Sequence, residues 1–379
     1  MLNPMLQGAG LLPSFYRALR QFEISQGWSI GEMDAEKTRI TTCLEEFYRE
    51  KHPETGDISI PWVVEMTSGW ETELYGFNLE YRENGVSRSR KMVARLHSGK
   101  SGGAKAKREY TVMKGLGAVG YPVPEVYDLE STGVYLGKPF LILEWISGRT
   151  MEKDFLNTPR EALGPHINTF SRLFADLHQI DCELIFHGTL YQGTQGYLES
   201  LIRRNREEVE AQGLEWLDPV LDWLEEMRGD VSEETISVLH RDFHPGNIIM
   251  RDDSSHAVID WGASQPGDYR DDLLWTVLLG SAFWGRTFGE MLLRGYERAA
   301  GKEVRDAGFW EVTGILRRIL DLAVSLTAGS EEAGMRSGGL EQMRGVTDHY
   351  HRIHGFLEGR TGLRLTEFEE LLRIMERRP

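Results

Sequence analysis

Residues 238–261 read VLHRDFHPGNIIMRDDSSHAVIDW, and they are the most informative part of the chain. Within it, His240, Asp242, Asn247 and Asp260 stand at the spacing that a kinase-type phosphoryl-transfer site requires. Asp242 can accept the proton of an attacking hydroxyl, and the other two oxygen-bearing tips suit Mg²⁺ on nucleotide phosphates. His240 is expected to support the loop rather than exchange protons. The stretch therefore predicts a catalytic loop followed by a metal-binding hairpin.

The residues between Asn247 and Asp260 predict the hairpin directly. Two apolar, β-prone runs, at residues 247–250 and 257–259, flank a polar turn at residues 251–255. This arrangement places the catalytic loop before the first strand and Asp260 after the second, so the tips can reach one cleft. A single Asp or Asn is usually an ordinary turn or cap residue, but four at this spacing argue against that interpretation.

The same residues carry a family resemblance. HRDFHPGN (240–247) with Ile259-Asp260-Trp261 resembles the aminoglycoside phosphotransferase family, which includes choline-kinase-like enzymes and shares the protein-kinase fold. The resemblance implies an α+β, two-lobed protein-kinase-like fold, with a small antiparallel β-sheet N-lobe and a larger, mostly helical C-lobe.

GDYRDDL (267–273) resembles that family's Gly-Asp-x-x-x-Asp-Leu element. Asp272 matches its last Asp, which the resemblance implies is a buried brace for the catalytic loop. Asp271 would match instead if the register slips by one. A plain helix N-cap is the alternative for Asp272.

Upstream of the catalytic loop the composition becomes β-like. Three strands are predicted, over residues 60–66, 73–81 and 92–97. The loop TSGWET (67–72) contains Ser68 and Gly69, and small residues there let backbone N–H groups approach triphosphate oxygens. This loop resembles the loose Gly/Ser loop of the aminoglycoside phosphotransferases rather than the glycine-rich loop of protein kinases.

The third predicted strand puts Arg95 where protein kinases carry a phosphate-binding lysine. A guanidinium can bind phosphate, so the electrostatic role is still possible. Alternatively, Lys91 or Lys100 binds the phosphates, or Arg95 is only a solvated strand residue. Glu109 is the only acid in the helix predicted over residues 104–116, which makes it the expected ion-pair partner of Arg95.

The predicted strand FLIL (140–143) leads to the hinge that the resemblance implies. There the backbone of Glu144 and Ile146 would meet the adenine edge. The predicted division is an N-terminal helical extension over 1–57, a nucleotide-binding N-lobe over 58–146, and a catalytic and substrate-binding C-lobe over 147–379. Apolar periodicity predicts helices over 14–26, 34–51, 167–179, two stretches within 196–227, 273–280, 287–298, 309–326 and 365–376.

Composition limits the partners. The chain has 379 residues and a net charge of −16, which argues against nucleic acid or an anionic membrane surface as a partner. The acidity is compatible with a cationic acceptor, although solvated helix faces explain it as well. With Cys43 and Cys182 as its two cysteines and no run near the roughly 18 apolar residues of a membrane span, the protein is expected in the cytoplasm.

The expected function is Mg²⁺-dependent transfer of the ATP γ-phosphate to a hydroxyl of a small molecule, which could be aminoglycoside-, sugar- or amino-alcohol-like. A protein kinase is the first alternative. However, eleven residues separate Asp260 from Asp272, and no Ala-Pro-Glu occurs among them, so a peptide-docking segment has no room. A nucleotide-binding regulatory pseudokinase is the second alternative, but Asp242, Asn247 and Asp260 are all present.

Overall fold

A computed structural model describes residues 35–66, 72–99, 101–188, 191–327 and 347–376. Ser68, Gly69, Lys100 and the helix predicted over 14–26 lie outside these residues. By internal contacts the chain forms two compact units. The first takes in Ser237–Pro266 with the described residues up to position 190, and the second contains Tyr191–Ile236 and the described residues from Gly267 onward. The lobe boundary predicted at 146/147 is a different division and stays a prediction.

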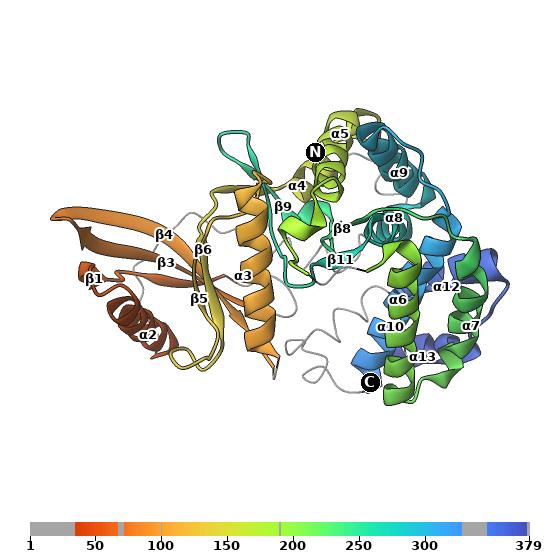
Figure 1. Ribbon diagram of the computed structural model, residues 1–379, viewed down its shortest axis with the longest axis horizontal. Helices are drawn as coiled ribbons and strands as arrows, with labels where there is room; N and C mark the ends of the chain where they lie inside the picture. Colours follow the sequence, from red (N-terminus) through yellow and green to blue (C-terminus); the bar gives the residue numbers. More distant parts are fainter. Residues whose placement is uncertain (1–34, 67–71, 100, 189–190, 328–346, 377–379) are drawn as a thin grey trace. The chain divides into compact units, whose positions relative to one another are not determined.

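The first unit is built on an antiparallel sheet with the order β1-β3-β4-β6-β5, and β2 also pairs with β3 (Figure 1). The strands are β1 (Gly56–Ser59), β2 (Val63–Met66), β3 (Thr72–Glu83), β4 (Val86–His97), β5 (Val126–Glu130) and β6 (Phe140–Glu144). Helix α3 (Gly102–Ala118) packs against β4, β5 and β6. The three predicted strands and the predicted helix 104–116 are thereby confirmed, with longer bounds for the later strands.

Strands β3 and β4 form one long hairpin, which was not predicted from the sequence. Their ladder runs from Thr72 opposite His97 to Glu83 opposite Val86. Asn84 and Gly85 make the turn, with φ angles of 50° and 79°. Two consecutive positive φ angles suit the right-handed twist of a hairpin, and Asn-Gly is the pair that adopts them most readily.

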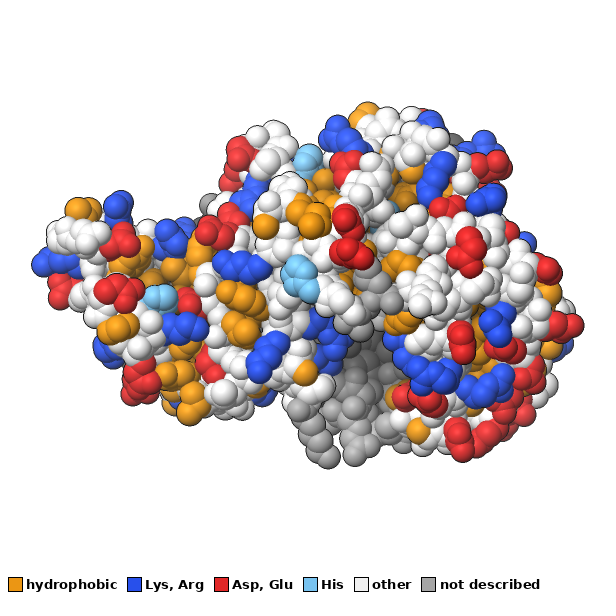
Figure 2. Space-filling model, in the orientation of Figure 1, with side chains coloured by type: hydrophobic (Ala, Val, Ile, Leu, Met, Phe, Trp, Pro, Cys, Tyr) orange, Lys and Arg blue, Asp and Glu red, His pale blue; other side chains and the backbone are white. Residues whose placement is uncertain are grey.

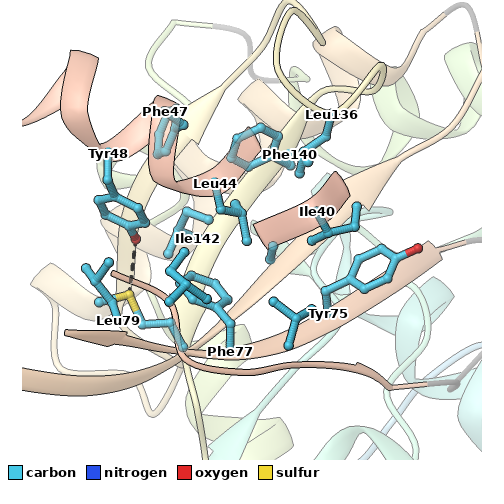
Figure 3. Packing of buried hydrophobic residues seen from close by; sticks show 14 of the residues in the cluster. Ile40, Leu44, Phe47, Tyr48, Tyr75, Phe77, Leu79, Leu136, Phe140 and Ile142 are labelled. Atoms are coloured by element: carbon cyan, nitrogen blue, oxygen red, sulfur yellow. Dashed lines mark hydrogen bonds between the residues drawn. The ribbon is translucent and has the colours of Figure 1, made fainter. Parts of the chain in front are cut away.

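Helix α2 (Ala35–Lys51) covers one face of this sheet (Figure 3). Its buried positions are Ile40, Leu44, Phe47 and Tyr48, as the helical spacing predicts. They pack on side chains of β3, β4 and β6, including Phe77 and Phe140, and the Tyr48 hydroxyl lies 3.2 Å from the Met92 sulfur. This helix of the expected extension is therefore part of the sheet's own hydrophobic core.

The catalytic segment adds small elements to the first unit. These are β7 (Gly148–Thr150), α4 (Met151–Asn157), α5 (Gly164–His178), β9 (Ile248–Arg251) and β10 (His256–Val258). The order β10-β9-β7 makes a three-stranded sheet, which contains the hairpin that the sequence predicts. Strands β8 (Ile236–Leu239) and β11 (Gln265–Asp268) form a two-stranded sheet, and the catalytic loop begins where β8 ends.

The second unit is helical. Its helices are α6 (Gly193–Gln212), α7 (Asp218–Met227), α8 (Tyr269–Trp284), α9 (Arg286–Ala300), α10 (Ala307–Thr327), α12 (Thr347–Thr361) and α13 (Thr366–Glu376). All but α12 are predicted by apolar periodicity. The antiparallel sheet of the first unit and the helices of the second confirm the α+β class.

The helical surface carries charges of both signs, interspersed on the face that Figure 2 shows. Arg203 pairs with Glu207 at 2.8 Å, and Arg206 pairs with Asp222 at 2.9 Å. These exposed pairs fit a solvated helix face better than an acidic acceptor site. Among the described residues, no helix has the length and apolar character needed to cross a membrane.

Candidate active site

His240 is a buried support of the catalytic loop. Its side chain is fully buried, and Nε2 lies 2.9 Å from the carbonyl oxygen of Ile259. The backbone N–H of Asp242 donates to Nδ1 at 3.2 Å. Both contacts are satisfied by a neutral ring that carries its proton on Nε2. The ring thus joins the start of the loop to the residue before Asp260, which is a supporting position.

Asp242 and Asn247 face one another across the loop. The Asn247 amide donates to the backbone carbonyl of Asp242 at 3.0 Å and lies 3.5 Å from Asp242 Oδ2. The Asp242 side chain is 41% exposed, so a substrate hydroxyl can reach it. Because the Asn247 nitrogen makes these contacts, its amide oxygen is turned away from them and can serve as a ligand.

Asp260 lies just after β10, as predicted, and its backbone has a φ of 71°. Arg241, in the catalytic loop, has a φ of 74°. Left-handed backbone at a non-glycine residue costs on the order of 1 kcal/mol and is often found at functional sites. The Ile259 N–H donates to the Asn247 carbonyl at 2.9 Å, which ties the end of the hairpin to the end of the loop.

Arg95 bridges two acids from different elements. Its Nη2 donates to Asp260 Oδ1 at 2.6 Å, and its Nε lies 3.2 Å from Glu109 Oε2 on α3. The predicted ion pair between Arg95 and Glu109 is therefore present. Lys91 is exposed, at the start of the buried part of β4, and Lys100 is outside the described residues. Among the described basic side chains of β4, Arg95 is the one that contacts both Asp260 and Glu109.

Burial opposes the charges of this cluster, and mutual attraction outweighs it. Arg95 loses solvation, but Asp260 and Glu109 raise its pKa. Burial would raise the pKa of Glu109, yet Arg95 and His97 hold it below the usual value. His97, with Nε2 3.2 Å from Glu109 Oε2, was missed by the sequence interpretation. Strand alternation could have found it, because residues 95 and 97 share one face of β4.

The expected hinge residues lie at the end of β6. The Glu144 carboxylate forms a two-pronged ion pair with Arg251, at 2.5 and 2.9 Å, so its side chain is engaged there. This contact lowers the pKa of Glu144. Arg251 was not identified from the sequence, because it is 107 residues away in the chain. The adenine contact expected of the Glu144 and Ile146 backbone stays a prediction.

Trp145, between the two hinge residues, lies on the sheet. A Cβ added to Gly76 would come within 2.2 Å of its indole ring, and Met66 lies against the same glycine. The ring centroid of Trp62 is 6.0 Å away in an edge-on arrangement. Gly76 is therefore a position where a strand must lack a side chain to admit an indole.

Two further groups of the catalytic loop region, His244 and Glu152, were not expected. His244 Nε2 lies 3.6 Å from Asp242 Oδ2, while its Nδ1 accepts a hydrogen bond from the Gly246 N–H at 3.1 Å. Burial lowers the pKa of His244, but the carboxylates of Asp242 and Glu152 more than offset this and raise it. Glu152, on α4, is only 8% exposed, and burial raises its pKa. Nothing in the sequence spacing pointed to Glu152.

The helix after the hairpin begins earlier than predicted. Asp268 is the N-cap of α8, because its side chain accepts from the Arg270 N–H at 3.0 Å. The N-cap interpretation of Asp272 is therefore wrong, since Asp272 lies fully buried in the first turn. Asp271 is also buried and accepts a hydrogen bond from the Tyr197 hydroxyl.

The donor set fits magnesium held partly by a substrate. Among the described residues, no three His, Cys, Asp or Glu side chains form a complete metal cluster. Mg²⁺ commonly uses one or two protein oxygens and takes the rest from waters and phosphates. Asp260, with a side chain 44% exposed, and the amide oxygen of Asn247 supply such a partial set.

The family model for the phosphotransferase enzyme family (APH) matches residues 78–310, more than half of the chain. The chain belongs to this phosphotransferase family. Membership makes it a phosphotransferase. Which hydroxyl it phosphorylates is a separate question.

Solved structures of the APH group share the fold. Aminoglycoside phosphotransferase APH(4)-Ia, solved with ADP and hygromycin B, has a TM-score of 0.53 and 18% identity, covering 84% of this chain and 99% of its own. Aminoglycoside 2'-phosphotransferase-IIIa, solved with GDP, has a TM-score of 0.54 and 16% identity, covering 85% and 99%. These likenesses confirm the protein-kinase-like fold.

Curated relatives are longer proteins. Acyl-CoA dehydrogenase family member 11 of Rattus norvegicus is 30% identical over 200 residues, which are 50% of this chain and 25% of the relative. Member 10 of Mus musculus is 25% identical over 181 residues, which are 45% and 16%. The chain thus spans a quarter or less of the length of these relatives.

Proposed function

We propose that this protein transfers the γ-phosphoryl group of ATP to a hydroxyl of a small molecule, with Asp242 as catalytic base. The observation that carries the proposal is that Arg95, from the sheet, meets Asp260, from the hairpin, at 2.6 Å. That contact supports the proposal, because it brings together the side chains proposed to bind phosphate and metal. Asp242 and Asn247 are joined to the same hairpin through the catalytic loop.

Each side chain has a role that follows from its charge. Asp242 orients the acceptor hydroxyl and takes its proton late, because phosphoryl transfer proceeds through a loose transition state. Asn247 and Asp260 would hold Mg²⁺, which supplies positive charge to the phosphates when bound. Arg95, aligned by Glu109, neutralises phosphate charge from the sheet side. His240 keeps the loop in register.

The nucleotide is proposed to contact the hinge backbone at Glu144 and Ile146. Ser68 and Gly69, which the sequence also suggests for phosphate binding, lie outside the described residues. Trp145 makes this proposal measurable, because its indole lies on the sheet within the hinge. Binding of a purine there is expected to change tryptophan fluorescence. Trp145→Phe should remove most of that change while nucleotide binding persists by calorimetry.

The acceptor is proposed to be an aminoglycoside-, sugar- or amino-alcohol-like compound, and its class can be tested directly. One structural neighbour binds hygromycin B, but at 18% identity its ligand is a weak guide. The curated relatives are named for acyl-CoA dehydrogenation, at up to 30% identity. A hydroxylated acyl-CoA therefore belongs in the same panel.

The alternatives are less well supported. Helix α8 begins at Tyr269, only eight residues after Trp261, and β11 occupies part of that stretch. A peptide-docking segment of the protein-kinase type would need a couple of dozen residues. A regulatory pseudokinase would be expected to lack a catalytic or metal residue, whereas the sequence contains Asp242, Asn247 and Asp260.

The experiment is an ADP-release assay with Mg²⁺ and a panel of aminoglycosides, sugars, amino alcohols and hydroxylated acyl-CoA compounds. The expected result is ADP release with one compound class, with a phosphorylated product seen by mass spectrometry. Release with peptides alone would support the protein-kinase alternative. ATP binding without transfer to any compound or peptide would overturn the proposal in favour of a pseudokinase.

A further inference from the structure

The His244 imidazole lies between the backbone N–H of Gly246 and the carboxylate of Asp242, the proposed catalytic base. The Gly246 N–H donates to Nδ1 at 3.1 Å, so that nitrogen carries no proton. In a neutral ring the proton is then on Nε2, which lies 3.6 Å from Asp242 Oδ2. The backbone contact therefore selects the tautomer whose N–H faces the carboxylate.

Gly246 lets the ring take this position. A Cβ built on Gly246 would lie 2.7 Å from Cε1 and 2.9 Å from Nδ1 of His244. The same Cβ would lie 3.8 Å from Oε2 of Glu152. The imidazole and the buried Glu152 carboxyl thus approach the same bare backbone, and α4 packs on the turn Pro245–Asn247 that contains it.

Asp242 needs a defined orientation because its carboxylate must meet a hydroxyl in line with the phosphate. A half-exposed aspartate on a loop has several rotamers, and each wrong rotamer lowers the fraction of productive complexes. The Asn247 amide nitrogen lies 3.5 Å from Asp242 Oδ2, and His244 Nε2 lies 3.6 Å from the same oxygen. Two N–H groups thus lie 3.5 and 3.6 Å from one oxygen, at the outer limit of hydrogen-bond length, and favour carboxylate rotamers that keep this oxygen near them.

We propose that His244 is a positioning residue that orients the Asp242 carboxylate through its Nε2–H, and that Gly246 and Glu152 hold its ring in place. The proposal rests on the proposed function, since it assigns the orientation of that reaction's base. His244 touches neither nucleotide nor acceptor in this role. It acts through Asp242.

A purely structural role is the competing explanation. His244 is the N-cap of the short helical turn Pro245–Asn247, and an N-cap needs only an acceptor for the Gly246 N–H. The two roles use different ring nitrogens. An asparagine side chain reproduces the acceptor at Nδ1 but does not reach Asp242, whereas a glutamine can place an N–H near the position of Nε2.

The kinetic test compares His244→Asn with His244→Gln on the acceptor identified by the panel. The proposal predicts that His244→Asn keeps its melting temperature and loses kcat by roughly 10- to 100-fold, with KM for ATP nearly unchanged. His244→Gln should recover most of the lost kcat even if it melts earlier. Full kcat in His244→Asn, or lost kcat in His244→Gln with normal kcat in His244→Asn, would overturn the proposal.

A second test does not depend on turnover. Histidine-selective ¹⁵N NMR of the full chain, assigned with His244→Asn, reads the tautomer of His244. The expected result is a proton on Nε2 and a clear shift of that nitrogen in Asp242→Asn. Asp253→Asn, in the exposed hairpin turn, is the matched control and should leave it unchanged.

The two tests separate the two claims. If no acceptor is phosphorylated but the Nε2 signal responds to Asp242→Asn, the proposed function fails while the contact stands. If transfer occurs but the signal ignores Asp242→Asn, or the proton resides on Nδ1, the positioning role is overturned and the phosphotransferase remains.

Discussion

Arg95 shows how one side chain can serve both the fold and the site. It is 9% exposed, and it compensates Glu109, which is 1% exposed. Removing one partner of such a buried pair leaves an uncompensated charge, whereas removing both does not. The same guanidinium also contacts Asp260, so the proposed nucleotide site and the stability of the fold share this residue.

Arg95→Met is expected to lower the free energy of unfolding by about 3–5 kcal/mol, because Glu109 stays buried without its main partner. Denaturant unfolding followed by circular dichroism measures the change. The double variant Arg95→Met/Glu109→Gln should recover part of the loss. Equal losses in the single and the double variant would show that the buried charge is not the cause.

Asp242→Asn is expected to reduce kcat on the order of 10²–10⁴-fold while ATP affinity stays nearly constant. The amide keeps the shape of the side chain but cannot accept the hydroxyl proton. Single-turnover kinetics together with nucleotide titration separate the two quantities, and Asp253→Asn is the control. Full turnover on a verified acceptor would refute Asp242 as the base.

Helices α8 and α9 pack so closely that one position must be glycine. A Cβ on Gly289 would lie 1.9 Å from the Ser281 hydroxyl and 2.9 Å from the Val277 carbonyl oxygen. The hydroxyl can rotate away, but the backbone carbonyl cannot. The close approach of these two helices therefore depends on the absence of a side chain.

Gly289→Ala is expected to destabilise the protein by about 1–3 kcal/mol, the usual cost of overpacking. Gly355→Ala, in α12, is the matched control because nothing lies within 4 Å of a Cβ there. That exposed helical substitution should stabilise by up to about 1 kcal/mol. Thermal melts of both variants check the contrast, and a neutral Gly289→Ala would mean that the helices separate easily.

Local patterns allowed most elements to be predicted. The hairpin β9–β10 follows from two β-prone runs around RDDSS, and the residues of α2 that face the sheet follow from helical spacing. The β3–β4 turn was missed although Asn84-Gly85 is a strong local signal. Helix α12 was missed because its histidines and glycines break the apolar pattern and favour helix weakly.

Some residues of the candidate site could likewise be predicted from local patterns, and others could not. Asp242, Asn247 and Asp260 share one stretch of chain, so spacing alone could bring them together. Arg251 and Glu152 could not be found this way, because their neighbours at the site come from distant segments. Contacts between residues far apart in the sequence cannot be predicted from spacing. They form only when α4 and the hairpin pack against the rest of the unit.

One buried histidine is expected to make the stability of the whole protein depend on pH. His349, on α12, is 2% exposed, stacks on Phe283 with ring centroids 4.0 Å apart, and accepts a hydrogen bond from Arg318 at 3.1 Å. Burial, with Arg318 and Arg352 nearby, holds its pKa well below the usual value. The folded protein therefore resists protonation at this site.

The unfolded chain takes up a proton on His349 below about pH 6.5, and the folded chain does not, so stability falls as pH falls through that range. His349→Gln keeps an acceptor for Arg318 without the titration. Unfolding free energies between pH 7.5 and about pH 5 should decline less steeply in this variant than in the wild type. Parallel pH curves would exclude His349 as a source of the decline.

Calorimetry tests the proposal that Asp260, Asn247 and Arg95 together bind a magnesium-bound nucleotide. A non-hydrolysable ATP analogue is titrated into wild type and Asp260→Asn, each with and without Mg²⁺. Wild type should bind at least about tenfold more tightly with Mg²⁺. Asp260→Asn should lose most of that gain, with metal-free binding unchanged or stronger because Arg95 is released. An equal gain in both proteins, or no gain in wild type, would contradict the account.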